Sequence, residues 1–214
     1  MTYSVKEVYL TLQGEGARTG RSAVFLRFAG CNLWSGREAD RARAVCRFCD
    51  TAFVGVDGQG GGKFGSASAL AEAVTRIWDG APAGAAPYVV CTGGEPFLQL
   101  DRPLIDALHG RGFEIGAETN GTLPAPAGLD WICVSPKAAA PLVQTSGNEL
   151  KLVFPQHERE ARPERFESLA FEHFFLQPLD DAGKADNLRA AFEYCRRHPR
   201  WKISLQTHKI IGVA

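Results

Sequence analysis

The chain has 214 residues, of which 45% are hydrophobic, and its 24 basic and 24 acidic side chains cancel. This length predicts a single domain over residues 1–214 with a substantial core. A chain without net charge has no overall field that would attract nucleic acid or an anionic membrane, so we expect neither as a partner. The start lacks a basic segment followed by an apolar run, and no stretch is long and apolar enough to span a bilayer, which favours a cytoplasmic protein.

The first half of the chain begins with a predicted strand. Residues 23–30 are rich in β-branched and aromatic side chains and end in glycine. The glycine-rich stretch 56–66 lacks the Gly-Lys-Ser/Thr ending of a phosphate-binding loop, so we interpret it as a flexible connection. Apolar residues at helical spacing then predict a helix that begins after Ser66 or Ser68 and ends at Trp78.

The rest of the chain alternates between strands and helices. Further strands are predicted at 87–96, 113–121, 129–137, 149–154, 173–180 and 201–212, and helices at 101–112 and 187–198. Such alternation produces parallel βαβ units. With about six strands and few helices, the sequence predicts an α/β fold that is a partial, incomplete TIM-like barrel.

Polar and glycine-containing motifs follow the predicted strands. They are TGGEP (92–96), ETNG (118–121), SPK (135–137) and QPLD (177–180). Because parallel strands bring their carboxyl ends to one face, we expect these motifs to gather at a single site.

Three cysteines, Cys31, Cys46 and Cys49, lie close together with no fourth at a matching spacing. A structural zinc site normally has four protein ligands. A [4Fe–4S] cube held by only three thiolates keeps one iron open for another ligand. We therefore expect a cluster-binding loop at 31–49, with a polar insertion at 34–45 that contains a short helix.

Two other interpretations of these cysteines stay open. One is a disulfide with a spare thiol, which a reducing compartment disfavours. The other is a zinc site completed by a distant histidine, His173, His198 or His208. The remaining cysteines lie in apolar segments and are predicted to be core residues: Cys91, Cys133 and Cys195.

The cysteine loop and the GGEP segment together resemble the radical S-adenosylmethionine (SAM) superfamily. The resemblance implies a [4Fe–4S] cluster whose open iron binds the amino and carboxylate groups of SAM. The family loop between the first two cysteines is usually much shorter than the fourteen residues of this chain. Implied or candidate contacts to SAM, each of which could instead be a packing or turn residue, are Phe48, Gly93, Gly94, Glu95, Glu118, Ser135, Lys137, Gln177 and Asp180.

The segment TLQGEG (11–16) narrows the resemblance to the 7-carboxy-7-deazaguanine synthase family of 7-deazapurine (queuosine) biosynthesis. The match continues through CDT (49–51) and the later motifs to LQTHK (205–209). It implies a carbon–nitrogen lyase that converts 6-carboxy-5,6,7,8-tetrahydropterin to 7-carboxy-7-deazaguanine with release of ammonia. It also implies a homodimer and a flavodoxin-like electron donor.

The same resemblance implies a substrate site. Arg27, on the strand before the first cysteine, suits a two-pronged contact with the pterin carboxylate. The family also uses Mg²⁺, and Thr51 matches its protein ligand, with Asp50 as a nearby carboxylate. The other candidate substrate contacts are Leu12, Gln13, Gly14, Glu15, Thr92, Gln206, His208 and the chain end at Ala214. Surface, capping or structural roles stay open for Arg27, Asp50, Glu15 and His208.

Two rival functions also stay open. The first is a glycyl-radical activating enzyme of the same superfamily, which would act on a protein. The match at both ends of the chain argues against it. The second is a zinc-stabilised binding module without catalysis.

Overall fold

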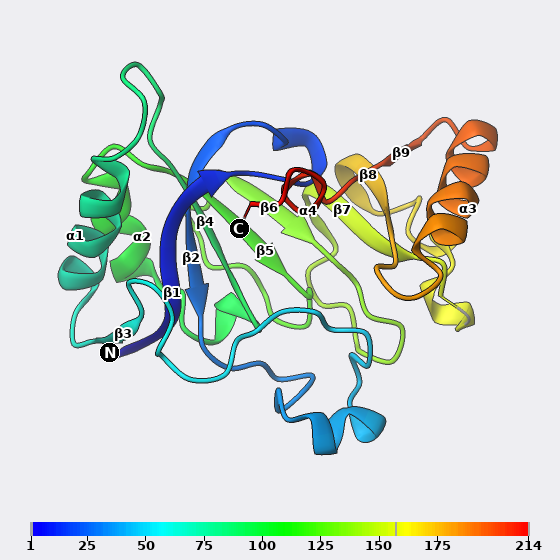
Figure 1. Cartoon of the computed structure of the whole chain (residues 1–214), viewed down its shortest axis with the longest axis horizontal. Helices are drawn as coiled ribbons and strands as arrows, with labels where there is room; N and C mark the ends of the chain where they lie inside the picture. The colour runs from blue at the N-terminus through cyan, green and yellow to red at the C-terminus, as the bar shows by residue number, and fades with distance from the viewer. Residues whose placement is uncertain (1, 157, 214) are drawn as a thin grey trace.

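The computed structural model describes residues 2–156 and 158–213. Within them, nine strands form one sheet in the order β3-β1-β2-β4-β5-β6-β7-β8-β9 (Figure 1). The strands are β1 (Tyr3–Leu12), β2 (Ser22–Phe28), β3 (Gly62–Phe64), β4 (Tyr88–Gly93), β5 (Glu114–Thr119), β6 (Trp131–Val134), β7 (Ser146–Phe154), β8 (Ala170–Pro178) and β9 (Trp201–Ile203).

The sheet is mostly parallel and is not closed. Every neighbouring pair from β2 across to β9 is parallel. β1 pairs antiparallel with both β2 and β3, so β3 and β9 are the two edges. This confirms the prediction of an α/β, partial barrel. The sequence analysis missed β1, and the expectation of a purely flexible connection at 56–66 was wrong, because β3 in that stretch pairs with β1.

The helices are α1 (Ala67–Trp78), α2 (Arg102–His109), α3 (Lys184–Arg197) and α4 (Thr207–Ile211). Ser66, one of the two predicted caps, accepts a hydrogen bond from the Ala69 amide at the start of α1. The prediction of a last strand at 201–212 holds only for β9, Trp201–Ile203, and was wrong for the residues after it. The ladder with β8 cannot run on past Pro178, which has no N–H to donate, and the chain turns into α4 instead.

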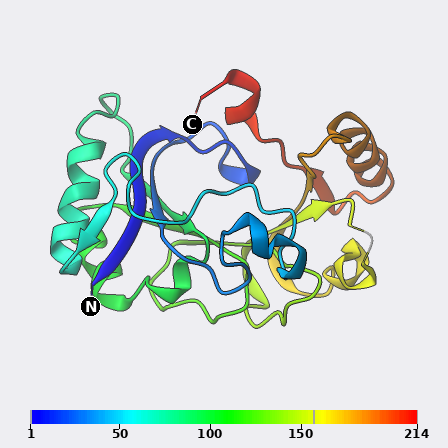
Figure 2. The same cartoon turned by 60° about the horizontal axis from the view of Figure 1, so that its bottom comes forward.

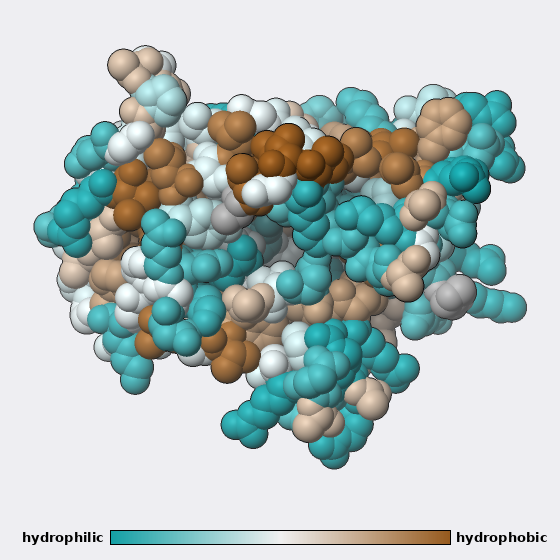
Figure 3. All heavy atoms as spheres, viewed as in Figure 1, coloured by the Kyte–Doolittle hydropathy of each residue, from teal (hydrophilic) through white to brown (hydrophobic). Residues whose placement is uncertain are grey.

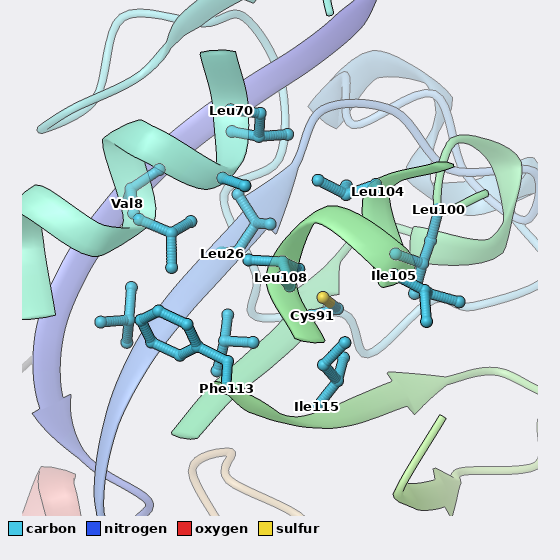
Figure 4. Close-up of a cluster of buried hydrophobic side chains, with 14 of the residues drawn as sticks. Val8, Leu26, Leu70, Cys91, Leu100, Leu104, Ile105, Leu108, Phe113 and Ile115 are labelled. Carbon is cyan, nitrogen blue, oxygen red and sulfur yellow. The ribbon is translucent and has the colours of Figure 1, made fainter. Parts of the chain in front are cut away.

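Two hydrophobic cores support the two halves of the sheet. α1 and α2 lie side by side over the first half and bury leucines such as Leu70, Leu104 and Leu108 against Leu26 (Figures 1 and 4). Each fully buried side chain of this size contributes roughly 1.5–3 kcal/mol. α3 covers the second half, where Trp201 of β9 belongs to the other core. These cores hold the strand ends in place.

One face of the molecule is hollowed near its centre. Figure 3 shows this hollow, and the apolar surface above it belongs to α4, where Ile210 is 66% exposed. Figures 1 and 2 show that the insertion after β2 stands out from the body near the same opening. The longest helix, α3, has 14 residues, and none of the helices in the described ranges could cross a membrane.

Candidate active site

A cavity of about 470 Å³ opens at the carboxyl ends of the parallel strands. It extends from β1 to α4, so both ends of the described chain contribute to it. Most of the predicted site residues line it: Leu12, Gln13, Glu15, Arg27, Cys31, Cys46, Phe48, Cys49, Thr51, Thr92, Gly93, Gly94, Glu118, Ser135, Lys137, Gln177, Asp180, Gln206 and His208. The structure thus brings these residues together, and their individual roles stay predictions.

Two predicted residues do not line the cavity. Gly14 lies behind it, where a Cβ atom would fall 2.3 Å from Nδ1 of His208, so this glycine lets the two segments pack. Glu95 is fully buried and accepts hydrogen bonds from the Phe97 amide (3.0 Å) and from the Asn120 amide (2.8 Å). Its carboxylate therefore fixes the loops after β4 and β5. A third prediction, Ala214, lies outside the described residues.

The glycine pair after β4 serves close packing of backbone on backbone. Gly93 has φ +138°, and a Cβ there would lie 2.3 Å from the carbonyl oxygen of Phe28. A Cβ on Gly94 would lie 2.2 Å from the carbonyl oxygen of Gly30 and 2.6 Å from Cβ of Cys31. Both glycines are candidate SAM contacts, and both line the cavity. In the structure they hold β4 against the start of the cysteine loop.

The cysteine loop folds so that its long insertion closes on itself. The amide of Val45 donates to the carbonyl oxygen of Leu33 at 3.1 Å, which joins the beginning and the end of the insertion. The predicted short helix within it is a 3₁₀ helix at Glu38–Arg43. Cys31 and Cys46 therefore both face the cavity although fourteen residues separate them.

The three loop cysteines are free thiols with unequal acidity. A hydrogen bond from the thiol of Cys46 lowers the pKa of Cys49 to about 6, and the same bond raises the pKa of Cys46. Burial raises the pKa of Cys31. Metal binding takes thiolates, so loading a metal site here would release protons from the less acidic thiols.

The arrangement of the three cysteines suits a cluster. Within residues 2–156 and 158–213, no three His, Cys, Asp or Glu side chains form a group that could hold a metal ion. Of the three histidines considered as a fourth zinc ligand, His173 lies beside Trp131 and His198 stacks on Tyr194 with ring centres 3.9 Å apart, whereas His208 lines the same cavity as the cysteines. Each thiolate of a cube binds a different iron, so cluster ligands need not converge on one point. Three thiols around an open cavity fit that demand.

A buried charge cluster lies deeper in the cavity, and the sequence analysis missed its centre, Lys151 of β7. Nζ of Lys151 is 2.5 Å from Glu15 and 3.6 Å from Glu118. Burial alone would raise the pKa of Glu15, but the charge and hydrogen bond of Lys151 lower it overall. Burial would lower the pKa of Lys151, and the carboxylates of Glu118 and Glu15 raise it instead. Glu15 and Lys151 therefore form a charged pair near neutral pH.

Hydrogen bonds extend this charge cluster across the cavity floor. Glu118 accepts from Gln13 Nε2 at 3.1 Å and from Thr92 Oγ1 at 3.3 Å. Glu15 accepts from Gln177 Nε2 at 3.1 Å. Polar side chains from β4, β5, β7, β8 and the loop after β1 are thus preorganised as one network.

Two cations at the cavity already have partners within the chain. Arg27 donates through Nε to Glu7 at 2.7 Å and through Nη2 to the Tyr9 hydroxyl at 3.2 Å. Lys137 donates to the carbonyl and hydroxyl oxygens of Ser135, at 2.6 and 2.7 Å. Burial lowers the pKa of Lys137. A bound anion would meet both cations held in fixed positions.

The C-terminal helix α4 is fastened over the cavity. Thr207 donates its amide and its hydroxyl to the carbonyl oxygen of Gly14, at 3.0 and 2.9 Å. Lys209, a residue that the sequence analysis did not single out, pairs with Asp50 at 2.7 Å and with Asp180 at 2.5 Å. This lysine joins α4, the cysteine loop and the end of β8.

Other residues that the sequence analysis missed are Glu7, Tyr9 and Asn120, which line the same cavity. Cys133, predicted to be a core residue, is buried, but it also reaches the cavity and donates its thiol to Glu149 at 3.2 Å. Lys151 could have been predicted from the sequence of β7. Side chains alternate between the two faces of a strand, so Lys151 lies on the same face as Glu149 and Val153.

An open α/β barrel with three cysteines at the carboxyl ends of its strands defines the radical SAM class of enzymes. No family model matches the chain. Over 213 residues it is 64% identical to 7-carboxy-7-deazaguanine synthase of Caulobacter vibrioides, with all of both chains covered. It is 59% identical over 214 residues to the Burkholderia multivorans protein of the same name, again with full coverage of both.

A solved structure agrees with this likeness. The crystal structure of QueE from Escherichia coli superposes with a TM-score of 0.73 at 29% identity, covering 97% of this chain and 95% of that one. The chain belongs to the 7-carboxy-7-deazaguanine synthase family. The prediction from the sequence motifs is confirmed, and membership in this family argues against a glycyl-radical activating enzyme and against a zinc module.

Proposed function

We propose that the chain converts 6-carboxy-5,6,7,8-tetrahydropterin to 7-carboxy-7-deazaguanine with loss of ammonia, the step that gives the family its name and a place in queuosine biosynthesis. One observation carries the proposal. The three cysteines and most of the substrate residues implied by the family line one cavity. We further propose that the whole chain acts as one radical SAM domain, with the cluster loop at 31–49 and its insertion at 34–45.

Cys31, Cys46 and Cys49 would hold the [4Fe–4S] cluster. Bound there, the cluster supplies the electron that cleaves SAM to methionine and a 5′-deoxyadenosyl radical. The chain's own task is to hold the reactants in place. Lys137 stands at the cavity with its ammonium already ordered by Ser135, which suits the SAM carboxylate.

The other proposed SAM contacts surround this position. They are Phe48 toward the adenine, the GGEP backbone at Gly93, Gly94 and Glu95 toward the amino group, and Glu118, Gln177 and Asp180 toward the ribose or adenine; all but the buried Glu95 line the cavity. Asp180 is paired with Lys209, so its contact with SAM would share that ion pair. Glu118 faces Lys151 and Gln13, which equally supports a role at the pterin.

The pterin would lie over the buried charge cluster. Glu15 and Gln13 can accept from and donate to the amide-like edge of the ring. Arg27 suits the C6 carboxylate through N–H groups beyond those that Glu7 and Tyr9 use. The remaining proposed contacts are Leu12, Gly14, Thr92, Gln206, His208 and the chain end at Ala214.

We also propose a Mg²⁺ ion beside Thr51, which lines the cavity next to Asp50. One hydroxyl is a weak site, so the ion would bind with substrate oxygens and water as its other ligands. Asp50 faces Lys209, which supports a role beside the ion rather than on it. EDTA should slow turnover and Mg²⁺ should restore it, and full turnover in metal-free buffer would refute the assignment.

The proposal includes a cytoplasmic location, a homodimer and a flavodoxin-like electron donor. It also includes contact between the C-terminal carboxylate and the substrate, which α4 supports by ending near the opening. A C-terminal tag should then raise KM, and unchanged kinetics would argue against that contact.

The test of the function is direct. The protein is reconstituted anaerobically with iron and sulfide and incubated with the carboxylated tetrahydropterin, SAM and a reductant. Mass spectrometry should detect 7-carboxy-7-deazaguanine and ammonia release, and the C46A variant should make neither. An intact cluster without product would refute the proposed reaction.

A further inference from the structure

The insertion at 34–45 holds the second half of the cluster loop through Arg41. Nη1 of Arg41 donates to the carbonyl oxygens of Arg47, at 2.8 Å, and of Cys49, at 3.1 Å. These two acceptors belong to the Cys46–Cys49 turn. A single guanidinium nitrogen thus connects the insertion with the backbone that carries two of the three loop thiols.

Arg41 is itself fixed from two other sides. Its Nε donates to both carboxylate oxygens of Glu38, at 2.8 and 2.9 Å. Its guanidinium carbon lies 4.2 Å from the ring centre of Trp34. Trp34 is buried and meets Phe53 edge to face, with ring centres 5.7 Å apart. A planar guanidinium can stack on an indole while its edge donates in several directions, which a lysine cannot do.

This arrangement accounts for the length of the insertion. Fourteen residues between the first two cysteines give the loop far more freedom than a short spacer. The hydrogen bond from Val45 to Leu33 closes the base of the insertion. It does not reach the Cys46–Cys49 turn, which lies beyond that closure and is contacted by Arg41.

We propose that Arg41 is a positioning residue for the [4Fe–4S] cluster. It holds the carbonyl groups of the Cys46–Cys49 turn, so that these two thiolates keep a fixed position relative to Cys31. The inference rests on the proposed function, because it takes the three cysteines as cluster ligands. Two consequences follow, one for cluster retention and one for its reduction potential.

The test compares R41Q with R43Q. Arg43 lies in the same 3₁₀ helix and pairs with Asp40, and its side chain is 84% exposed, so its replacement removes the same charge without touching the turn. After anaerobic reconstitution, iron release to a chelator and the midpoint potential are measured. R41Q should release iron about tenfold faster than the parent, the effect of losing one charge-assisted hydrogen bond. R43Q should behave as the parent does.

Iron release and the midpoint potential together separate the planar fork of Arg41 from its charge. R41Q removes a positive charge and leaves Glu38 unpaired, and both changes disfavour the added electron, so the midpoint should become more negative. R41K keeps the charge without the planar fork. It should restore the potential while its iron release stays faster than that of the parent.

Equal iron release and equal potential in R41Q and R43Q would overturn the inference. So would a loss of thermal stability in R41Q with cluster retention and potential unchanged. If the parent chain itself takes up no cluster, the proposed function fails, and that result is distinguishable from failure of the role of Arg41 alone. R41K keeps the comparison decisive if R41Q does not fold.

Discussion

Replacement of Lys151 by methionine should destabilise the protein strongly. The side chain is 7% exposed and Nζ lies 2.5 Å from Glu15, whose own side chain is 14% exposed. Methionine keeps much of the volume but removes the charge, which leaves Glu15 buried without its counter-ion. Breaking a buried ion pair in this way costs about 3–5 kcal/mol. That is a large part of a total stability of about 5–15 kcal/mol.

Urea unfolding of the apoprotein, followed by circular dichroism, measures this effect. With a slope of about 2–3 kcal/mol/M, the midpoint should fall by roughly 1–2 M. The control is R76M, because Arg76 forms an exposed pair with Glu72 on α1, and losing such a pair should cost about 0.5 kcal/mol or less. The double variant E15Q/K151M should recover much of the loss, since it removes the unpaired charge as well.

The pH dependence gives a second check on the same pair. Lys151 holds the pKa of Glu15 below its ordinary value of 4.5 in spite of burial, so the stabilisation is present above that pH and is lost as pH falls through the lower folded value. The pKa of Lys151 is raised above 10.5, so the pair persists at neutral and mildly alkaline pH. The reasoning is refuted if K151M unfolds at the urea midpoint of R76M, or if the difference between parent and K151M is unchanged well below pH 4.5.

Three further predictions concern two residues of the cavity wall and the buried Glu95. G94A should load less iron than the parent after equal reconstitution, because a Cβ there would lie 2.2 Å from the carbonyl oxygen of Gly30; equal iron content would contradict this. K209M removes the ion pairs with Asp50 and Asp180 and should raise KM more than it lowers kcat. The difference in KM between K209M and the parent should shrink at high salt, because salt screens the lost ion pairs. A change in KM that does not depend on salt would contradict this. E95Q replaces one accepting oxygen with a donor and should cost about 1–3 kcal/mol in urea unfolding, whereas an unchanged midpoint would show that the buried carboxylate is dispensable.

The strand-end motifs were predictable from the sequence because the rule behind them is topological. Residues that follow buried parallel strands must emerge at one edge of the sheet, so Thr92, Glu118, Ser135 and Gln177 come together whatever the loop details are. Cys31 could be placed there for the same reason, since it follows β2 directly, and Cys46 and Cys49 were placed with it as members of one loop.

The remainder depended on contacts between distant segments. β1 escaped notice because its pairing with β2 and β3 is antiparallel and lies outside the βαβ pattern. The packing of Gly14 against His208 and the ion pair of Lys209 with Asp50 join segments more than 150 residues apart, which no local pattern encodes. α4 was mistaken for the end of a strand because Trp201, Ile203 and Leu205 alternate with polar residues immediately before it.

Mössbauer spectroscopy of the anaerobically reconstituted protein, with and without SAM, tests the central claim most directly. We predict a [4Fe–4S] cube in which one iron in four changes its spectrum when SAM is added, because only three thiolates are supplied by the chain. Replacement of Cys31, Cys46 or Cys49 by alanine should abolish the cube. The account would be contradicted if the spectra of all four irons stay unchanged when SAM is added. It would also be contradicted if the cube still forms after any one of these cysteines is replaced by alanine.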